Sequence, residues 1–268
     1  MRVKAELVKS YIQGSDIEGY EEEWFFEECG HIFVNPSYEI EHRETVGRIF
    51  QQIKASIEGF IPCNVEIWDK LFFNWREIID KVTINLIVGY PEPYDATVIK
   101  APDGESNVIL DLGLWAKYEG KCDIPRVVNN LLTHELCHVC IGKTIQGIDE
   151  DIESEDYLIN LDANTFHEAF AHLISFEDKA INEVQWDTEE WAIVIKNCRE
   201  RMKEALVESN LDKQQEFLQE AFCGNYKEKY AAISGMFYLV DCWREKGLVG
   251  LEEVFKSGYH GFATRTVN

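Results

Sequence analysis

The sequence has no long apolar run. Its longest apolar stretches, such as Met236–Val240, are much shorter than the roughly 18 residues that cross a bilayer. We therefore expect no transmembrane helix and no membrane partner. The N-terminus, from Met1 to Glu6, lacks the apolar core of a secretory signal and is typical of a cytoplasmic protein.

Basic residues are also scarce, because 26 Lys and Arg stand against 49 Asp and Glu, which gives a formal net charge of −23 at pH 7. No stretch gathers Lys and Arg into a stripe with aromatic residues between them. A surface of this sign repels phosphate backbones, so we expect no nucleic acid partner. The acidity favours cationic substrates or simply keeps the protein in solution, and composition does not distinguish these roles.

The chain shows no internal repeat and no linker rich in proline, glycine or serine. We therefore predict one compact unit over residues 1–268, for which a hydrophobic content of 46% supplies a sizeable core. Within it we distinguish a mainly helical region at 1–80, a sheet with one long helix at 81–142, and a helical half at 143–268. The eight cysteines are dispersed, which favours reduced thiols over a disulfide framework.

Hydrophobic periodicity predicts an α+β fold with a small mixed sheet and a helical C-terminal half. Amphipathic patterns at 40–57 and 67–79 indicate helices, and short apolar runs at 31–35, 82–88 and 108–112 indicate strands. We assign the aromatic residues of the second helix to the core, because apolar stripes at helical spacing are usually packing faces. These residues are Trp68, Phe72, Phe73 and Trp75.

A further helix is predicted over about 125–141. Asp123 is placed to cap its N-terminus, and Pro125 lies in the first turn, where a missing N–H is harmless. Gly142 follows the last apolar position and is expected to end the helix.

This helix carries His134 and His138, which are four residues apart and therefore lie on one face, where both imidazoles can reach one ion. Zinc binds neutral imidazole nitrogens at about 2.0–2.1 Å and, in catalytic sites, keeps a position open for water. Glu135 lies beside the two histidines and is placed to take a proton from that water.

A catalytic zinc needs a third protein ligand. A histidine six residues after His138 is excluded, because that position holds a threonine. The next candidates lie in the segment 164–174, whose asparagine cap and apolar pattern predict a second helix. Glu168 is one of them, and it also fits a capping box in which it only bonds the helix N-terminus. In that case His167 or His172 would be the third ligand.

These motifs resemble the gluzincin metallopeptidases, in which His-Glu-x-x-His is followed by a glutamate ligand on a later helix. The resemblance covers residues 82–175. It implies a zincin-like fold and one Zn²⁺ per chain, held by His134, His138 and Glu168. It also implies that Glu135 is the catalytic general base and that the substrate is a peptide or protein.

The chain departs from this family at His172, where many gluzincins have an acidic residue that hydrogen-bonds a zinc-bound imidazole. His172 itself, as acceptor or ligand, or Asp162 would then supply the orientation. Hydrolysis also requires a donor to the oxyanion, and the distance of Tyr230 from Glu168 resembles that of the catalytic tyrosine of some gluzincins. The other candidates for this donor are Tyr238, Tyr259 and His260.

Three further features complete the expectations. Cys137 and Cys140 are assigned to packing rather than to redox or metal chemistry. The acidic run 149–156 is expected to be a solvated, mobile loop, with calcium binding as the alternative. The strand at 108–112 is expected to be an edge strand that binds an extended peptide, as the resemblance to zincins implies.

The function with the most support from the sequence is therefore zinc-dependent peptide hydrolysis. Two alternatives stay open at this stage. One is a regulatory protein that binds zinc without catalysis, and the other is a zinc hydrolase that acts on a non-peptide amide.

Overall fold

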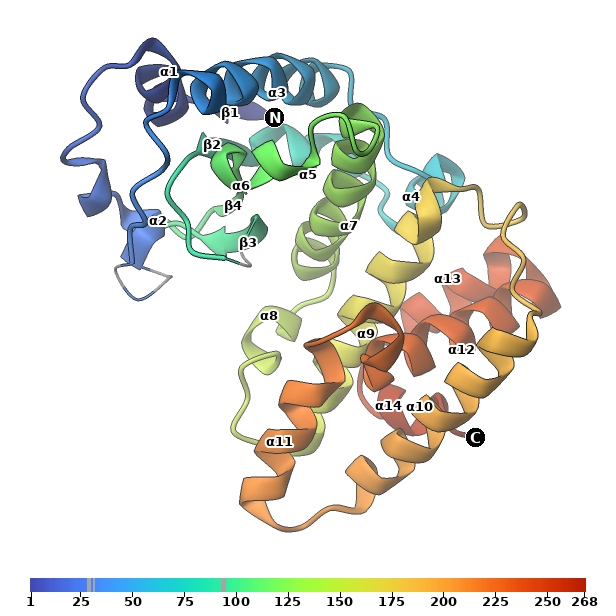
Figure 1. The fold of residues 1–268 in the computed structure, drawn as a ribbon. Helices are drawn as coiled ribbons and strands as arrows, with labels where there is room; N and C mark the ends of the chain where they lie inside the picture. The colour runs from blue at the N-terminus through green and yellow to red at the C-terminus, as the bar shows by residue number, and fades with distance from the viewer. Residues whose placement is uncertain (28–29, 31, 93–94) are drawn as a thin grey trace. The chain divides into compact units, whose positions relative to one another are not determined.

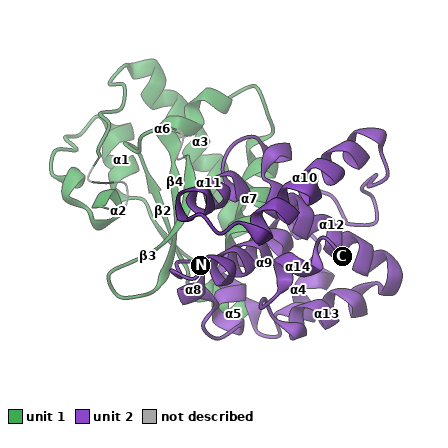
Figure 2. Cartoon of the chain, turned by 90° about the horizontal axis from the view of Figure 1, so that it is seen from below, with its two compact units in different colours: residues 1–61, 76–135 green, residues 62–75, 136–268 purple. Residues whose placement is uncertain are grey.

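The computed structural model describes residues 1–27, 30, 32–92 and 95–268, most of them in helices, with one four-stranded mixed sheet (Figure 1). The predicted mixture of helices with a small sheet is confirmed. The chain divides into two compact units, one formed by residues 1–61 and 76–135 and the other by residues 62–75 and 136–268 (Figure 2). The last boundary lies inside a helix, so no linker composition marks it in the sequence.

The sheet lies in the first unit and has the strand order β1-β2-β4-β3. Its strands are β1 (Arg2–Lys4), β2 (Thr83–Ile87), β3 (Ala96–Lys100) and β4 (Ser106–Asp111). β1, β2 and β4 are parallel, and β3 is antiparallel to β4. Every residue of β2 is buried, including the polar Thr83 and Asn85, as expected for a strand inside a covered sheet.

The prediction of an edge strand at 108–112 is wrong. β4 pairs with β2 on one side and with β3 on the other, so that Val108 lies opposite both Ile84 and Val98. Within the described part of the chain, β3 pairs only with β4 and is half-exposed along most of its length. The two edge strands of the sheet are therefore β1 and β3.

The helices of the first unit include α1 (Glu6–Gln13), α2 (Trp24–Glu27), α3 (Ile40–Glu58), α5 (Trp75–Lys81), α6 (Leu112–Trp115) and the first half of α7 (Ile124–Thr144). The predicted helix at 40–57 is confirmed as α3, which buries Val46, Ile49, Phe50, Ile53 and Ile57 at helical spacing. Residues 32–35 form no strand, although Val34 N donates to Gly89 O at 2.8 Å; His31 lies outside the described residues.

The predicted helix at 67–79 is two helices, α4 (Val65–Leu71) and α5, separated by a turn. Trp68, Phe72 and Trp75 are buried as expected. The assignment of Phe73 to the core is wrong, because its place in the turn leaves it 99% exposed. Apolar spacing alone did not reveal this interruption.

The second unit is helical, as predicted for the C-terminal half. Besides α4 and the second half of α7 it contains α8 (Ile148–Asp151), α9 (Tyr157–Ser175), α10 (Glu189–Val207), α11 (Leu211–Phe222), α12 (Tyr230–Lys246), α13 (Leu248–Ser257) and α14 (Phe262–Arg265). None of the helices that the structure describes combines the length and the apolar character that a bilayer crossing requires.

The core of this unit is built on α9, which packs against α12. The two helices approach closely because Gly235 of α12 has no side chain: a Cβ there would lie 2.7 Å from the Cβ of Ala169. Both helices are buried around most of their circumference, as expected for helices at the centre of a bundle. Glu168, beside Ala169, is therefore attached to one of the most tightly packed segments of the unit.

Candidate metal centre

The helix that carries His134 and His138 begins where the sequence predicts. Asp123 Oδ1 accepts a hydrogen bond from Arg126 N at 3.3 Å, and Pro125 lies in the first turn. Its predicted end is wrong, because α7 continues past Gly142 to Thr144. Gly142 instead permits a close approach, since a Cβ at this position would lie 2.1 Å from Asp149 Oδ1.

The second predicted helix begins earlier than expected. α9 starts at Tyr157. Asp156 caps it, because its side chain accepts hydrogen bonds from two backbone amides of the first turn, Leu158 N and Ile159 N. Asn164 does not cap the helix but donates to Ile152 O at 2.9 Å. Glu168 therefore lies in the middle of α9, and the capping-box interpretation of Glu168 is wrong.

Three histidines that the sequence singled out lie around Glu168, and two of them, His134 and His172, converge with it as candidate ligands. His134, Glu168 and His172 each offer a ligand atom, and these atoms lie within 4.8 Å of one another. On the next turn of α7, His138 Nε2 lies 3.5 Å from Glu168 Oε1, and His172 Nε2 lies 3.0 Å from Glu168 Oε2. Within the described residues, this is the only group of three or more His, Cys, Asp or Glu ligand atoms that converge in this way.

The donor atoms fit a transition-metal ion. Two ligands at tetrahedral positions on an ion with bonds of about 2.0–2.1 Å lie about 3.3 Å apart, close to the 3.5 Å between His138 Nε2 and Glu168 Oε1. Burial lowers the pKa of His138 against the opposing charges of Glu168 and Asp149, which keeps the imidazole in the neutral form that binds metal. Imidazole nitrogens with one carboxylate are a donor set that suits zinc and its neighbours in the first transition row.

Access to the cluster differs among its members. The side chains of His138 and Glu168 are 19% and 22% exposed, whereas that of His172 is 10% exposed. Glu135 lies next to His134 on α7 and is half-buried. A small molecule can therefore approach the carboxylate at the centre of the group, which a fully enclosed structural site would not permit.

The two cysteines of α7 are packing residues. Cys137 and Cys140 are fully buried, and burial raises the pKa of both thiols well above the usual range, so both stay protonated. A thiolate ligand or redox role is inconsistent with this environment. The described cysteines form no disulfide with one another, and Cys29 lies outside the described residues.

Tyr230 does not lie at the cluster. It is 2% exposed, and its hydroxyl donates to Phe217 O at 3.1 Å, a backbone carbonyl of α11. The tyrosine that contacts the cluster is Tyr226, whose ring meets His172 edge-on at a centroid distance of 4.9 Å. Burial, followed by the negative charge of Glu168, raises the pKa of Tyr226, so its hydroxyl stays protonated, and it donates to Met236 Sδ at 3.6 Å.

The other residues that the sequence considered have different roles. Asp162 caps α14 by accepting hydrogen bonds from Gly261 N at 2.5 Å and Ala263 N at 2.9 Å, so it does not orient a histidine. Tyr259 donates to Asp151, and Tyr238 packs against Phe262. His260 stacks on the ring of Tyr259. None of these contacts involves the metal cluster.

The acidic run 149–156 is partly helical and partly a turn with exposed residues, so the prediction of a loop holds only for its second half. Its first residues form α8, and Asp156 caps α9. Asp149 lies against Gly142, with its Oδ1 4.0 Å from His167 Nε2. The carboxylates of this run thus have specific structural partners, which the sequence pattern could not show.

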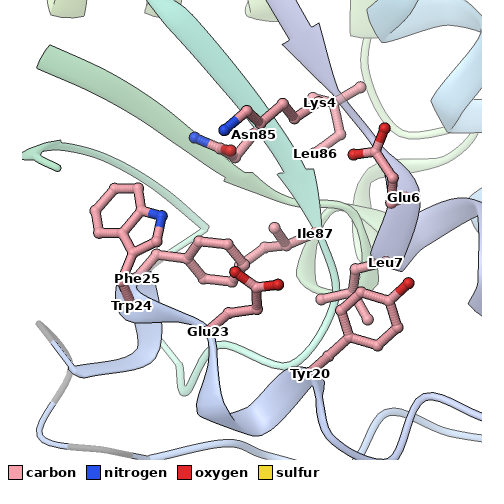
Figure 3. Close-up of a pocket in the computed structure, with 10 residues that line it drawn as sticks. All are labelled: Lys4, Glu6, Leu7, Tyr20, Glu23, Trp24, Phe25, Asn85, Leu86 and Ile87. Carbon is pink, nitrogen blue, oxygen red and sulfur yellow. The ribbon is translucent and has the colours of Figure 1, made fainter. Parts of the chain in front are cut away.

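The first unit has a pocket of its own, with a volume of about 320 Å³ (Figure 3). It combines charged groups of both signs with aromatic rings and contains no histidine or cysteine. Its lining residues are Lys4, Glu6, Leu7, Tyr20, Glu23, Trp24, Phe25, Asn85, Leu86 and Ile87.

Comparison with known protein families, with curated proteins and with solved structures found no match for this chain. The functional conclusion therefore depends on the residues of the cluster.

We expect the metal-free protein to lose stability as the pH falls below 6.5. Burial and the neighbouring His138 lower the pKa of His167 to about 3, and burial also lowers that of His138. In the unfolded chain both titrate near 6.5, so below that pH the unfolded state binds protons that the native state does not. The stabilising contribution is fully present above about pH 6.5 and is lost progressively toward pH 3.

Urea unfolding in the presence of a chelator measures this effect. Between pH 7 and 5 most carboxylates do not titrate, so the change in stability reports mainly on the histidines. In the variant His167→Leu the free energy of unfolding should fall less steeply with decreasing pH. The difference in slope should be up to about 1.4 kcal/mol per pH unit, because one titrating group is absent. The same slope in the variant and the wild type would contradict the prediction.

Proposed function

We propose that this chain is a zinc-dependent metallopeptidase of the gluzincin type, with a zincin-like arrangement of sheet and helices. The observation that carries the proposal is the convergence of ligand atoms of His134, Glu168 and His172 from α7 and α9. His138 is not a member of this group, but its Nε2 lies 3.5 Å from Glu168 Oε1. The motif predicted this meeting although its two halves are 30 residues apart in the sequence.

Each residue has a definite part in the proposed site. His134, His138 and Glu168 would hold the ion, and His172 would donate to the second oxygen of Glu168. A bound zinc supplies Lewis acidity for amide hydrolysis. Glu135 would act as the general base, and Tyr226 would replace Tyr230 as the donor to the oxyanion once its hydroxyl turns away from Met236 Sδ.

The proposed substrate is a peptide in an extended conformation. β3 pairs only with β4 among the described strands, and its other edge is the place where an extended peptide would add as a further strand by main-chain hydrogen bonds. The net charge of −23 favours basic peptides over acidic ones, because a negative surface attracts cations.

A second candidate function is supported by His172. If His172 binds the ion directly, four protein ligands enclose it, as in structural zinc sites, and the chain would be a non-catalytic zinc-binding regulator. The 3.0 Å contact between His172 Nε2 and Glu168 Oε2 places the imidazole beside the carboxylate, where it can support Glu168 without binding the ion, and this placement favours the catalytic function.

Metal analysis combined with a peptide assay tests the proposal. The protein, stripped with a chelator and reconstituted, should bind about one zinc per chain and cleave members of a peptide library, with cleavage abolished by the chelator. Absence of bound zinc after reconstitution would exclude both candidates. Stoichiometric zinc without hydrolysis of any peptide would favour the regulatory protein.

A further inference from the structure

His138 presents its two ring nitrogens to different partners. Its Nε2 faces Glu168 Oε1 at 3.5 Å, and its Nδ1 lies 3.3 Å from Nδ1 of His167. The rings of His138 and His167 are tilted by 32° with centroids 5.5 Å apart. The nitrogen away from the candidate ion thus has a side-chain partner on α9, the helix that also carries Glu168.

His167 is itself enclosed. It is 6% exposed, and its Nε2 is buried without a hydrogen bond among the described residues. The acidic group that faces this nitrogen is Asp149, whose Oδ1 is 4.0 Å away. A buried polar nitrogen aimed at a carboxylate just beyond hydrogen-bond distance needs only a small movement, or one bridging water, to be satisfied.

Asp149 reaches this position because Gly142 gives it room. A Cβ on residue 142 would lie 2.1 Å from Asp149 Oδ1 and 2.7 Å from its Cγ. Gly142 lies in the middle of the last turns of α7, where alanine would otherwise be the better helix former. A glycine here is therefore explained by the approach of Asp149.

We propose that His167 is a positioning residue for the metal ligand His138, and that Asp149 positions His167 in turn. This inference rests on the proposed metal centre. The proton positions are consistent along the chain of contacts. A metal on Nε2 of His138 leaves the proton on Nδ1, which donates to Nδ1 of His167; the proton of His167 is then on Nε2, directed at Asp149.

The arrangement takes the place of the acidic residue that His172 does not provide. Groups that hold the second nitrogen of a ligating histidine fix its tautomer and the orientation of its ring, and their loss reduces metal affinity by roughly 10–100-fold. Here the imidazole of His167 holds the second nitrogen of His138 directly, and the carboxylate of Asp149 acts indirectly by holding His167. The effect of His167 should therefore exceed that of Asp149.

Zinc affinity, measured by competition with a chromophoric chelator, tests the proposal in the full chain. His167→Leu removes the acceptor and should raise the zinc Kd by roughly 10–100-fold. His167→Asn keeps an acceptor atom near the Nδ1 position and should restore the Kd to within a few-fold of the wild type. A merely structural role would not distinguish these two variants in this way.

A second pair of variants avoids any change to the histidines. Gly142→Ala displaces the Asp149 carboxylate while favouring the helix, so zinc affinity should fall and the metal-free protein should remain folded, as judged by circular dichroism. Glu150→Gln removes one negative charge from the exposed neighbour of Asp149 and is the matched control, with unchanged affinity. The absorption spectrum of bound Co²⁺ should change in Gly142→Ala and His167→Leu but not in Glu150→Gln.

The outcomes separate this inference from the proposed function. If wild-type protein binds one zinc and His167→Leu and Gly142→Ala bind it equally well, the positioning role is overturned and the metal centre stands. If wild-type protein binds no zinc, the metal centre and the positioning role both fall. Weaker binding in these variants, with rescue by His167→Asn, supports the proposal.

Discussion

Glu135→Gln should retain bound zinc and lose peptide hydrolysis by a factor on the order of 10²–10⁴. The amide has the shape of the carboxylate but cannot take a proton from water at neutral pH. Because Glu135 is the residue after His134 on α7 rather than a member of the converging group, its replacement leaves the proposed ligands unchanged. kcat from peptide cleavage and zinc content from elemental analysis give the two measurements.

The matched control is Glu150→Gln, an isosteric change of an exposed glutamate on α8, for which kcat should equal that of the wild type. Hydrolysis at wild-type rate by Glu135→Gln would exclude Glu135 as the base. Loss of zinc from the same variant would instead give Glu135 a role in holding the ion.

Glu168→Ala should reduce zinc affinity by more than the roughly 100-fold that residues behind a ligand contribute. Glu168 is the centre of the cluster, since its two oxygens face His138 and His172 at 3.5 and 3.0 Å. Alanine removes a ligand and both contacts, while the helix itself is favoured. Competition with a chelator measures the affinity, and urea unfolding of the metal-free variant verifies that α9 still folds.

His172→Ala is the informative comparison for this experiment. In the proposed site it removes the contacts with Glu168 Oε2 and with the ring of Tyr226 but no ligand, so its effect on zinc affinity should be clearly smaller than that of Glu168→Ala. If the two effects are reversed, His172 is the third ligand in place of Glu168. Equally large losses of affinity in both variants would indicate four ligands and support the second candidate function.

The sequence predicted the elements of the site where local chemistry determines them. Asp123 and Pro125 define the start of α7, because a cap and a first-turn proline act within a few residues. The spacing of His134 and His138 follows from the helical repeat alone. The strands at the centre of the sheet were also recognisable, since burial on both faces gives continuous apolar runs.

The failures occurred where distant parts of the chain decide the structure. Gly142 had the sequence signature of a helix end, yet its role depends on Asp149, which the helical pattern does not include. Asp156 and Asn164 are both possible caps for α9; in the structure Asp156 is the cap and the Asn164 amide donates to Ile152 O. β1 and β3 are short and half-exposed, so they lack the apolar signal of β2 and β4.

The tyrosine of the site illustrates the same limit. Tyr226 and Tyr230 are four residues apart, and their distances along the chain from Glu168 are too similar to discriminate between them. What separates them is the path of the backbone before α12, which buries Tyr230 against α11 and turns Tyr226 toward His172. No local pattern of residues encodes that path.

The close crossing of α9 and α12 at Gly235 has a thermodynamic consequence for metal binding. Glu168 and His172 belong to a helix whose backbone is already immobilised by the apolar core, with the missing Cβ of Gly235 setting its distance from α12. The backbone of these two residues therefore loses its conformational entropy during folding and not when an ion binds. An ion that enters such a site encounters ligands whose main-chain positions are already fixed, so the association itself requires little reordering of the protein.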